Sequence, residues 1–147
     1  MNKKIIIGVG MIALILLAVF VVKPKNNTIN NTNLTGATKV QIFLFHATQR
    51  CPTCVRIGQW TKATVEERFP EQLGSGKIEF REINIDLPEN KELAEKFQAG
   101  GSSLYINSIK DGQDNIAEDT MVWQLAGETS DKFKNYLSNK INVILGI

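Results

Sequence analysis

The sequence has few residues of the kinds that bind metals or close disulfides: two cysteines and one histidine among 147 residues. A four-ligand zinc site built from cysteine and histidine is therefore excluded within one chain, because only three such ligands exist. A framework of several disulfides is excluded as well, since the chain has a single pair of cysteines. Any sulfur chemistry of this protein must use that one pair.

The chain also lacks a surplus of positive charge in its larger part. The first 25 residues carry four lysines and no acid, but from residue 38 onward acidic residues outnumber basic ones. Binding to nucleic acid needs a basic face that neutralises phosphates. The charge balance therefore argues against nucleic acid as a partner.

A long apolar run stands near the N-terminus. Residues 5–22, IIIGVGMIALILLAVFVV, follow a short basic start, and 18 apolar residues are just enough to span a bilayer as a helix. A cleaved signal peptide is the alternative, but no A-x-A-like cleavage site follows the run. We predict that residues 1–22 form an uncleaved, single-pass transmembrane anchor in the cell membrane. The short leading segment favours the N-terminus inside and the rest of the chain on the extracytoplasmic side, periplasmic or extracellular.

The next segment, residues 23–37, is rich in Asn and Thr and poor in apolar residues, as is typical of a solvated tether. Residues 38–147 have the composition of one folded domain. We therefore predict three parts: an anchor, a tether and a globular domain.

Apolar periodicity within residues 38–147 predicts alternating strands and helices. An almost continuous apolar run predicts a buried first strand, and the segment PEQLGSG should end the helix that follows it. Gly100 and Gly101 should end the second helix, and Ser130 should cap the last one. The predicted strands cover residues 39–45, 77–87, 103–109 and 113–117, and the predicted helices begin at residues 52, 88 and 130. The order β-α-β-α-β-β-α predicts an α/β fold, with a four-stranded mixed sheet flanked by helices.

The most informative stretch is FHATQRCPTC, residues 45–54. Cys51 and Cys54 stand three apart at the predicted start of a helix, where backbone N–H groups and the helix dipole favour an anion such as a thiolate. We predict that Cys51 is the exposed nucleophile and that Cys54, one turn further on, is partly buried and resolves a mixed disulfide. The pair would then serve as a redox-active disulfide with no other cofactor.

A CxxC motif after a strand, within a βαβ pattern, resembles the thioredoxin-like superfamily. More narrowly, FHATQRCPTC followed by VEERFPEQLGSGKIEFREINID resembles the ArsF-type subunit of nitrophenyl compound nitroreductase, over about residues 39–145. The resemblance implies dithiol–disulfide electron transfer, as the small redox subunit of a membrane system. The sequence shows no flavin, haem or nicotinamide motif, so this chain alone should not reduce a nitro group.

The sequence departs from ordinary thioredoxins at two places. The resemblance implies a cis-proline at the start of the third strand, where this chain has Ser102 or Ser103, and a buried acid at the position of Phe45. The cis-proline helps to position the substrate backbone and discourages metal binding, so its absence implies a weaker hold on the substrate. His46 is the nearest substitute for the missing acid. The resemblance also implies that Pro52 and Thr53, between the cysteines, set the reduction potential.

Other interpretations of these residues stay open. Arg50 precedes Cys51 and either stabilises its thiolate or lies in solvent. The cysteine pair is either redox-active, a structural disulfide or, together with His46, a three-ligand carrier site for copper or zinc. For the redox function the partners would be a substrate protein with a disulfide or dithiol and a membrane protein that donates or accepts electrons.

Overall fold

The computed structural model describes residues 36–147. The predicted anchor, and all of the predicted tether except Gly36 and Ala37, lie outside the described residues. In the part of the chain that is described, no helix combines the length and the apolar character needed to cross a membrane.

The centre of the fold is a four-stranded mixed sheet, as the sequence predicted. Its strands are β1 (Lys39–His46), β2 (Ile78–Asn84), β3 (Ser103–Lys110) and β4 (Gln113–Glu118). Their order in the sheet is β2-β1-β3-β4, with β1 parallel to β2 and β3 antiparallel to both β1 and β4. The parallel pair is joined by a helical crossover and the antiparallel pair by a tight turn, which is the thioredoxin-like arrangement.

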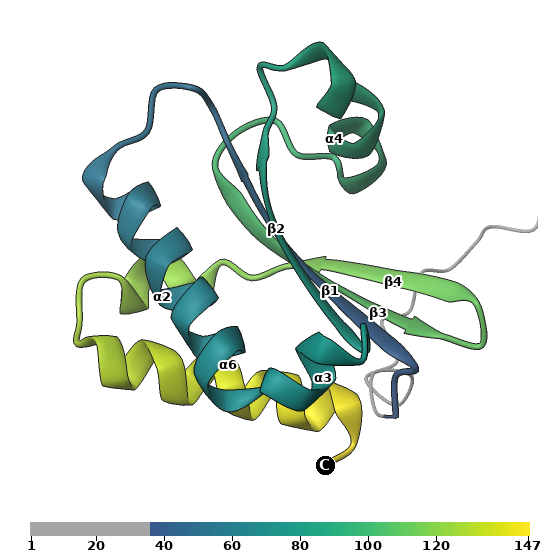
Figure 1. The fold of residues 1–147 in the computed structure, drawn as a ribbon. Coiled ribbons are helices and arrows are strands. Elements are labelled where there is room, and N and C mark those ends of the chain that lie inside the picture. The colour runs from purple at the N-terminus through teal and green to yellow at the C-terminus, as the bar shows by residue number, and fades with distance from the viewer. Residues whose placement is uncertain (1–35) are drawn as a thin grey trace, which may run out of the picture. The chain divides into compact units, whose positions relative to one another are not determined.

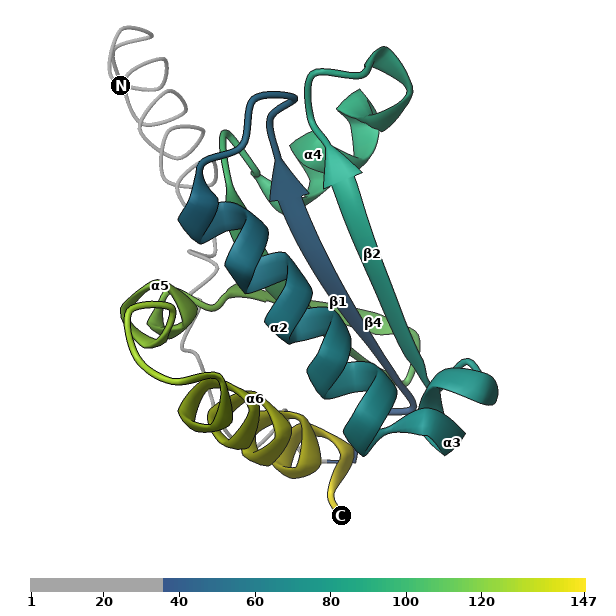
Figure 2. The same cartoon turned by 60° about the vertical axis from the view of Figure 1, so that its left-hand side comes forward.

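Helices cover both faces of this sheet (Figures 1 and 2). Figure 1 shows α2 and α6 on one face and the shorter α4 near one end of the other. The helical segments are α2 (Pro52–Arg68), α3 (Pro70–Gly74), the 3₁₀ turn η2 (Pro88–Asn90), α4 (Lys91–Phe97), α5 (Met121–Leu125) and α6 (Ser130–Leu145).

Side chains that alternate along β1 build a core on each side of the sheet, because successive residues of a strand point to opposite faces. Ile42 and Leu44 join the larger core under α2, α5 and α6, whereas Phe43 and Phe45 pack against Phe97 of α4. All five side chains are almost fully buried. Burying an apolar side chain of this size contributes about 1.5–3 kcal/mol, so the near-continuous apolar run of β1 stabilises both layers.

The structure confirms one predicted helix end and corrects two others. The segment PEQLGSG ends α2 as predicted, and Pro70 also opens the short helix α3. The second helix ends at Phe97, and its C-cap Gln98 adopts a left-handed conformation (φ 56°) before Gly100 is reached. Ser130 is the first residue of α6 and not its cap; the Thr129 side chain accepts the N–H of Lys132 instead.

Candidate redox-active site

Cys51 lies at the junction between the loop after β1 and the start of α2. Its backbone is extended (φ −74°, ψ 158°), and its sulfur accepts the N–H of Cys54 at 3.3 Å. Pro52 occupies the first turn of the helix, where its missing N–H costs nothing. Cys51 is therefore the N-cap of α2, with a sulfur in the place of the usual capping oxygen.

The two thiols lie together but in different surroundings. Their sulfur atoms are 2.7 Å apart, both cysteines are free, Cys51 is exposed and Cys54 is buried. This is the arrangement that the spacing predicted. A disulfide can close here without moving the backbone, and a partner sulfur can approach Cys51 but not Cys54.

The pKa of the Cys51 thiol lies below its ordinary value. The largest cause is the hydrogen bond from the Cys54 side chain, followed by the backbone N–H of Cys54, while desolvation opposes them. Each of these hydrogen bonds favours the anionic form of sulfur. Since the thiolate is the nucleophile in disulfide exchange, the site activates Cys51.

The loop that carries Cys51 is tied to the end of β2 by polar contacts. The N–H of Thr48 donates to Asp86 at 2.8 Å, and Asn84 donates to the Thr48 hydroxyl at 3.0 Å. Asn90 in turn donates to the carbonyl of Asn84. The hydrogen bond from the Thr48 backbone holds the pKa of Asp86 below its ordinary value. The loop therefore has a fixed place relative to β2.

Arg50 does not lie in solvent but turns under the first turn of α2. Its guanidinium donates to Glu82 of β2 at 2.6 Å and to the carbonyl of Cys54 at 3.0 Å. Glu82 thus places a carboxylate near the first turn of α2 through Arg50, whereas the role expected of His46, to substitute for the missing acid, stays a prediction. The sequence did not reveal the contact between Glu82 and Arg50, because this contact depends on the β1–β2 register, in which Glu82 lies opposite Leu44.

The residues in the place of the cis-proline begin β3. Ser103 lies opposite Phe45 in the β1–β3 ladder, and its hydroxyl donates to the carbonyl of Gly101 at 3.1 Å. Ser102 is half-buried beside it. Phe45 itself packs in the core under α4, away from α2.

His46 ends β1 with its Nδ1 atom 2.9 Å from the carbonyl of Ala47. Within residues 36–147, no three side chains of His, Cys, Asp or Glu come together as ligands for a metal ion. The structure therefore does not assemble His46, Cys51 and Cys54 into the three-ligand set of the carrier hypothesis.

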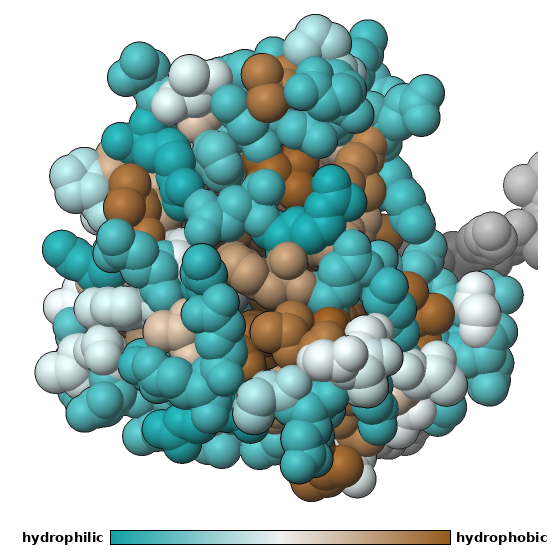
Figure 3. Space-filling view, in the orientation of Figure 1, coloured by the Kyte–Doolittle hydropathy of each residue, from teal (hydrophilic) through white to brown (hydrophobic). Residues whose placement is uncertain are grey.

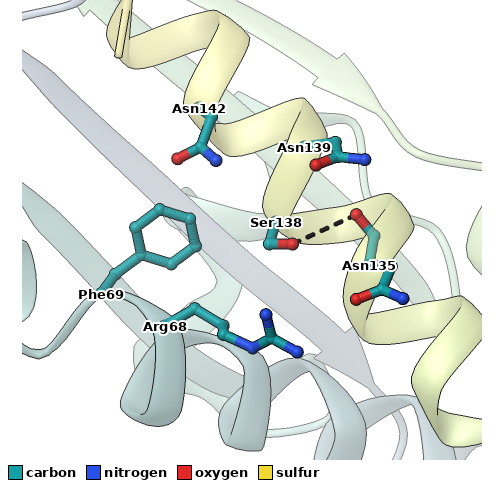
Figure 4. Close-up of a pocket in the computed structure, with 6 residues that line it drawn as sticks. All are labelled: Arg68, Phe69, Asn135, Ser138, Asn139 and Asn142. Carbon is teal, nitrogen blue, oxygen red and sulfur yellow. Dashed lines mark hydrogen bonds between the residues drawn. The ribbon is translucent and has the colours of Figure 1, made fainter.

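Two recesses in the described surface lie along α2. One has a volume of about 400 Å³ and lies at the C-terminal end of α2. Figure 4 shows the residues that line it: Arg68, Phe69, Asn135, Ser138, Asn139 and Asn142. The other, of about 370 Å³, lies between α2, α3 and β2, where Figure 3 shows apolar side chains at the surface. It is lined by Lys62, Val65, Glu66, Leu73, Phe80 and Glu82. Neither contains a cysteine, and only the second meets the Arg50–Glu82 pair.

No protein-family model and no curated protein sequence matches the chain. Among solved structures, a thioredoxin from Thermus thermophilus is 18% identical with a TM-score of 0.47, over 74% of this chain and 77% of that one. A thioredoxin from Fasciola hepatica is 20% identical with a TM-score of 0.42, over 76% of this chain and 88% of that one. A thioredoxin-like protein from Clostridium perfringens is 13% identical with a TM-score of 0.44, over 80% and 90%.

These similarities are weak, so the class of the protein rests on its own strands and cysteines. The strand order, the crossover and the CxxC pair at the start of α2 define a dithiol protein of thioredoxin-like fold. The narrower resemblance to a nitroreductase subunit stays a prediction from the motif.

Proposed function

We propose that this protein is a thiol–disulfide oxidoreductase that works through Cys51 and Cys54. The observation that carries the proposal is the pairing of an exposed thiol, with its pKa lowered by its neighbours, and a buried thiol whose sulfur is 2.7 Å away. A structural disulfide explains this arrangement less well, because a bridge across three residues removes little chain entropy.

The reaction in the reducing direction has two exchanges. The Cys51 thiolate attacks a disulfide of the partner, forms a mixed disulfide and releases one partner thiolate. Cys54 loses its proton and attacks the Cys51 sulfur, so that the intramolecular disulfide forms and the second partner thiolate leaves. Two electrons pass to the partner, and the reverse sequence oxidises a partner dithiol.

Trapping of the mixed disulfide tests this proposal. The Cys54→Ser variant should accumulate disulfide-linked complexes in cells, because nothing resolves the bond at Cys51. Reduction should separate these complexes into their component proteins. The matched Cys51→Ser variant should accumulate none, since Cys54 is buried. Equal trapping by both variants, or by neither, would contradict the assignment of roles.

We also propose that the domain is tethered to the cell membrane by residues 1–22 and works on the extracytoplasmic side. The apolar run and the absence of a cleavage site in the sequence support this. In an oxidising compartment a dithiol needs a source of electrons, so a membrane protein should donate electrons to the pair or accept them from it.

Thiol labelling in intact cells tests the location. After treatment of the cells with a reductant that cannot cross membranes, a maleimide that cannot cross them either should label Cys51 in the Cys54→Ser variant. The labelled protein should sediment with membranes. Protection of Cys51 until the cells are opened would overturn the extracytoplasmic location.

The narrower role, as the redox subunit of a nitroreductase-type system, is supported by the FHATQRCPTC motif alone. In this proposal the dithiol passes electrons to a separate catalytic subunit. The chemically reduced protein alone should then leave a nitroaromatic compound unchanged. Consumption of that compound by the purified, metal-free chain would place the nitro chemistry on this chain and overturn the electron-carrier role.

A further inference from the structure

An ion pair is bonded to the first turn of α2. Arg50 precedes Cys51 in the chain, and Glu82 comes from the middle of β2, yet the guanidinium and the carboxylate meet at 2.6 Å. The Arg50 side chain is only 19% exposed, and its Nε atom is buried with no partner. By contrast, the Lys62–Glu66 pair on the outer face of α2 is more than half exposed and 3.8 Å apart. The Arg50–Glu82 pair is thus no ordinary surface ion pair.

The same guanidinium is bonded to the backbone of the redox motif. Its Nη2 atom donates to the carbonyl of Cys54 at 3.0 Å, while the N–H of Cys54 donates to the Cys51 sulfur at 3.3 Å. Both backbone polar groups of Cys54 are therefore engaged, one by the nucleophile and one by Arg50. A shift of Arg50 would move the N–H that stabilises the Cys51 thiolate.

The helix leaves space for this guanidinium at Gly58. A Cβ atom at residue 58 would lie 2.8 Å from Nη2 of Arg50, 2.9 Å from Leu44 and 3.3 Å from Glu82. Gly58 is buried within α2, where glycine costs about 1 kcal/mol relative to alanine. A glycine at this position is explained by the room that Arg50 and Leu44 need.

We propose that Arg50 and Glu82 are a positioning pair that fixes the first turn of α2 and sets the balance between the dithiol and disulfide forms of Cys51–Cys54. The inference rests on the proposed redox function. In this proposal the positive charge of Arg50 favours a thiolate at Cys51, and the negative charge of Glu82 opposes this effect. Because a stabilised thiolate favours the reduced form, the two residues act on the equilibrium in opposite directions.

The two charges can be removed separately. Glu82→Gln should shift the equilibrium with glutathione toward the dithiol, and Arg50→Gln should shift it toward the disulfide. Solvent reaches 33% of the Glu82 side chain, so each shift should be about threefold and not several orders of magnitude. Arg50→Lys keeps the charge and should lie between Arg50→Gln and the wild type.

Two further variants separate charge from packing. Glu79→Gln removes a carboxylate from the same strand, where it pairs with Lys39, and should leave the equilibrium within about twofold of wild type. Gly58→Ala keeps both charges but displaces the guanidinium, so it should shift the equilibrium in the direction of Arg50→Gln.

The experiment is a titration of each full-length variant in glutathione buffers, with the dithiol fraction read by thiol alkylation and the melting temperature measured beside it. Opposite shifts for Glu82→Gln and Arg50→Gln support the inference. The same equilibrium in all variants, or shifts of Glu82→Gln and Arg50→Gln in the same direction, overturns it, even where melting temperatures fall. A wild-type protein that forms no Cys51–Cys54 disulfide at any glutathione ratio would instead overturn the proposed function itself.

Discussion

At the scale of single residues, the site depends on the different surroundings of two identical side chains. Cys51 caps α2 and faces solvent, whereas Cys54 is buried one turn further along. The N-terminal N–H groups of a helix and a neighbouring thiol both favour an anion at Cys51. One thiol is therefore available to a partner, and the other is reserved for the second step.

The lowered pKa of Cys51 gives a prediction for its pH dependence. The pKa of the Cys51 thiol is lower than that of an ordinary thiol, about 8.5, so the rate of alkylation should reach its plateau at a lower pH than for a free thiol. The Cys54→Ala variant removes the largest cause and should move this profile to higher pH. Cys54→Ser keeps an O–H donor and should move it less. A profile that is the same in both variants and the wild type would show that Cys54 does not stabilise the thiolate.

The sequence predicts this part of the site because the motif is local. Three-residue spacing at a helix start determines which cysteine is exposed. The sequence named Arg50 as a candidate residue but did not show where its side chain lies, and it did not point to Glu82. Glu82 comes close to Arg50 because β1 pairs with β2 in a register that places Leu44 opposite Glu82. No local sequence pattern encodes that register.

At the scale of secondary-structure elements, α6 depends on a side-chain cap outside its first turn. Thr129 has an extended backbone, and its hydroxyl accepts the N–H of Lys132 at 3.4 Å. Thr129→Ala should therefore lower the free energy of unfolding by about 1 kcal/mol. Ser130→Ala is the matched control and should change it by less than about 0.5 kcal/mol. Urea denaturation measures both, and a larger loss for Ser130→Ala would restore the cap that the sequence predicted.

Strands and long helices were predictable from the sequence, whereas their ends were not. The apolar run of β1 and the periodicity of α2 persist over several residues, so the signals add up. A cap or a stop depends on one backbone conformation. Gln98 takes the left-handed conformation two residues before the glycines that favour it, and α3 forms directly after α2 because Pro70 is tolerated at a helix start.

At the scale of the whole domain, a buried carboxylate links the hairpin to the C-terminal helices. Asp119 follows β4, is 1% exposed, and accepts hydrogen bonds from Tyr136 at 3.0 Å and Lys140 at 2.9 Å. It also accepts the N–H of Met121 at the start of α5. Burial, and then the neighbouring carboxylate, raise the pKa of Tyr136, as expected for a phenol beside a negative charge.

Removing this carboxylate should weaken the whole domain. Asp119→Ala removes the buried acceptor shared by Lys140, the Tyr136 hydroxyl and the N–H of Met121, and should cost about 3–5 kcal/mol in the free energy of unfolding. Glu128→Gln breaks the exposed pair with Lys132 and should cost less than about 1 kcal/mol. Denaturant titration compares the two variants. Equal losses would show that Asp119 contributes no more than a surface charge.

The topology was predictable because its connections leave few choices. A strand, a helix and a second strand give a parallel pair, and Asp111-Gly112 between two strands gives a hairpin. Both residues have positive φ, as this turn requires. The ion pairs between distant segments, Arg50–Glu82 and Lys140–Asp119, were not predictable, because they appear only when the layers pack.

The central claim is that Cys51 and Cys54 interconvert as one two-electron couple. The most direct test is to equilibrate the full-length protein with graded ratios of reduced and oxidised glutathione and to identify the products by mass after alkylation. We expect a single transition between a species with two free thiols and one with a Cys51–Cys54 disulfide. A protein that keeps two free thiols at every ratio, or that only collects glutathione on Cys51, would contradict it.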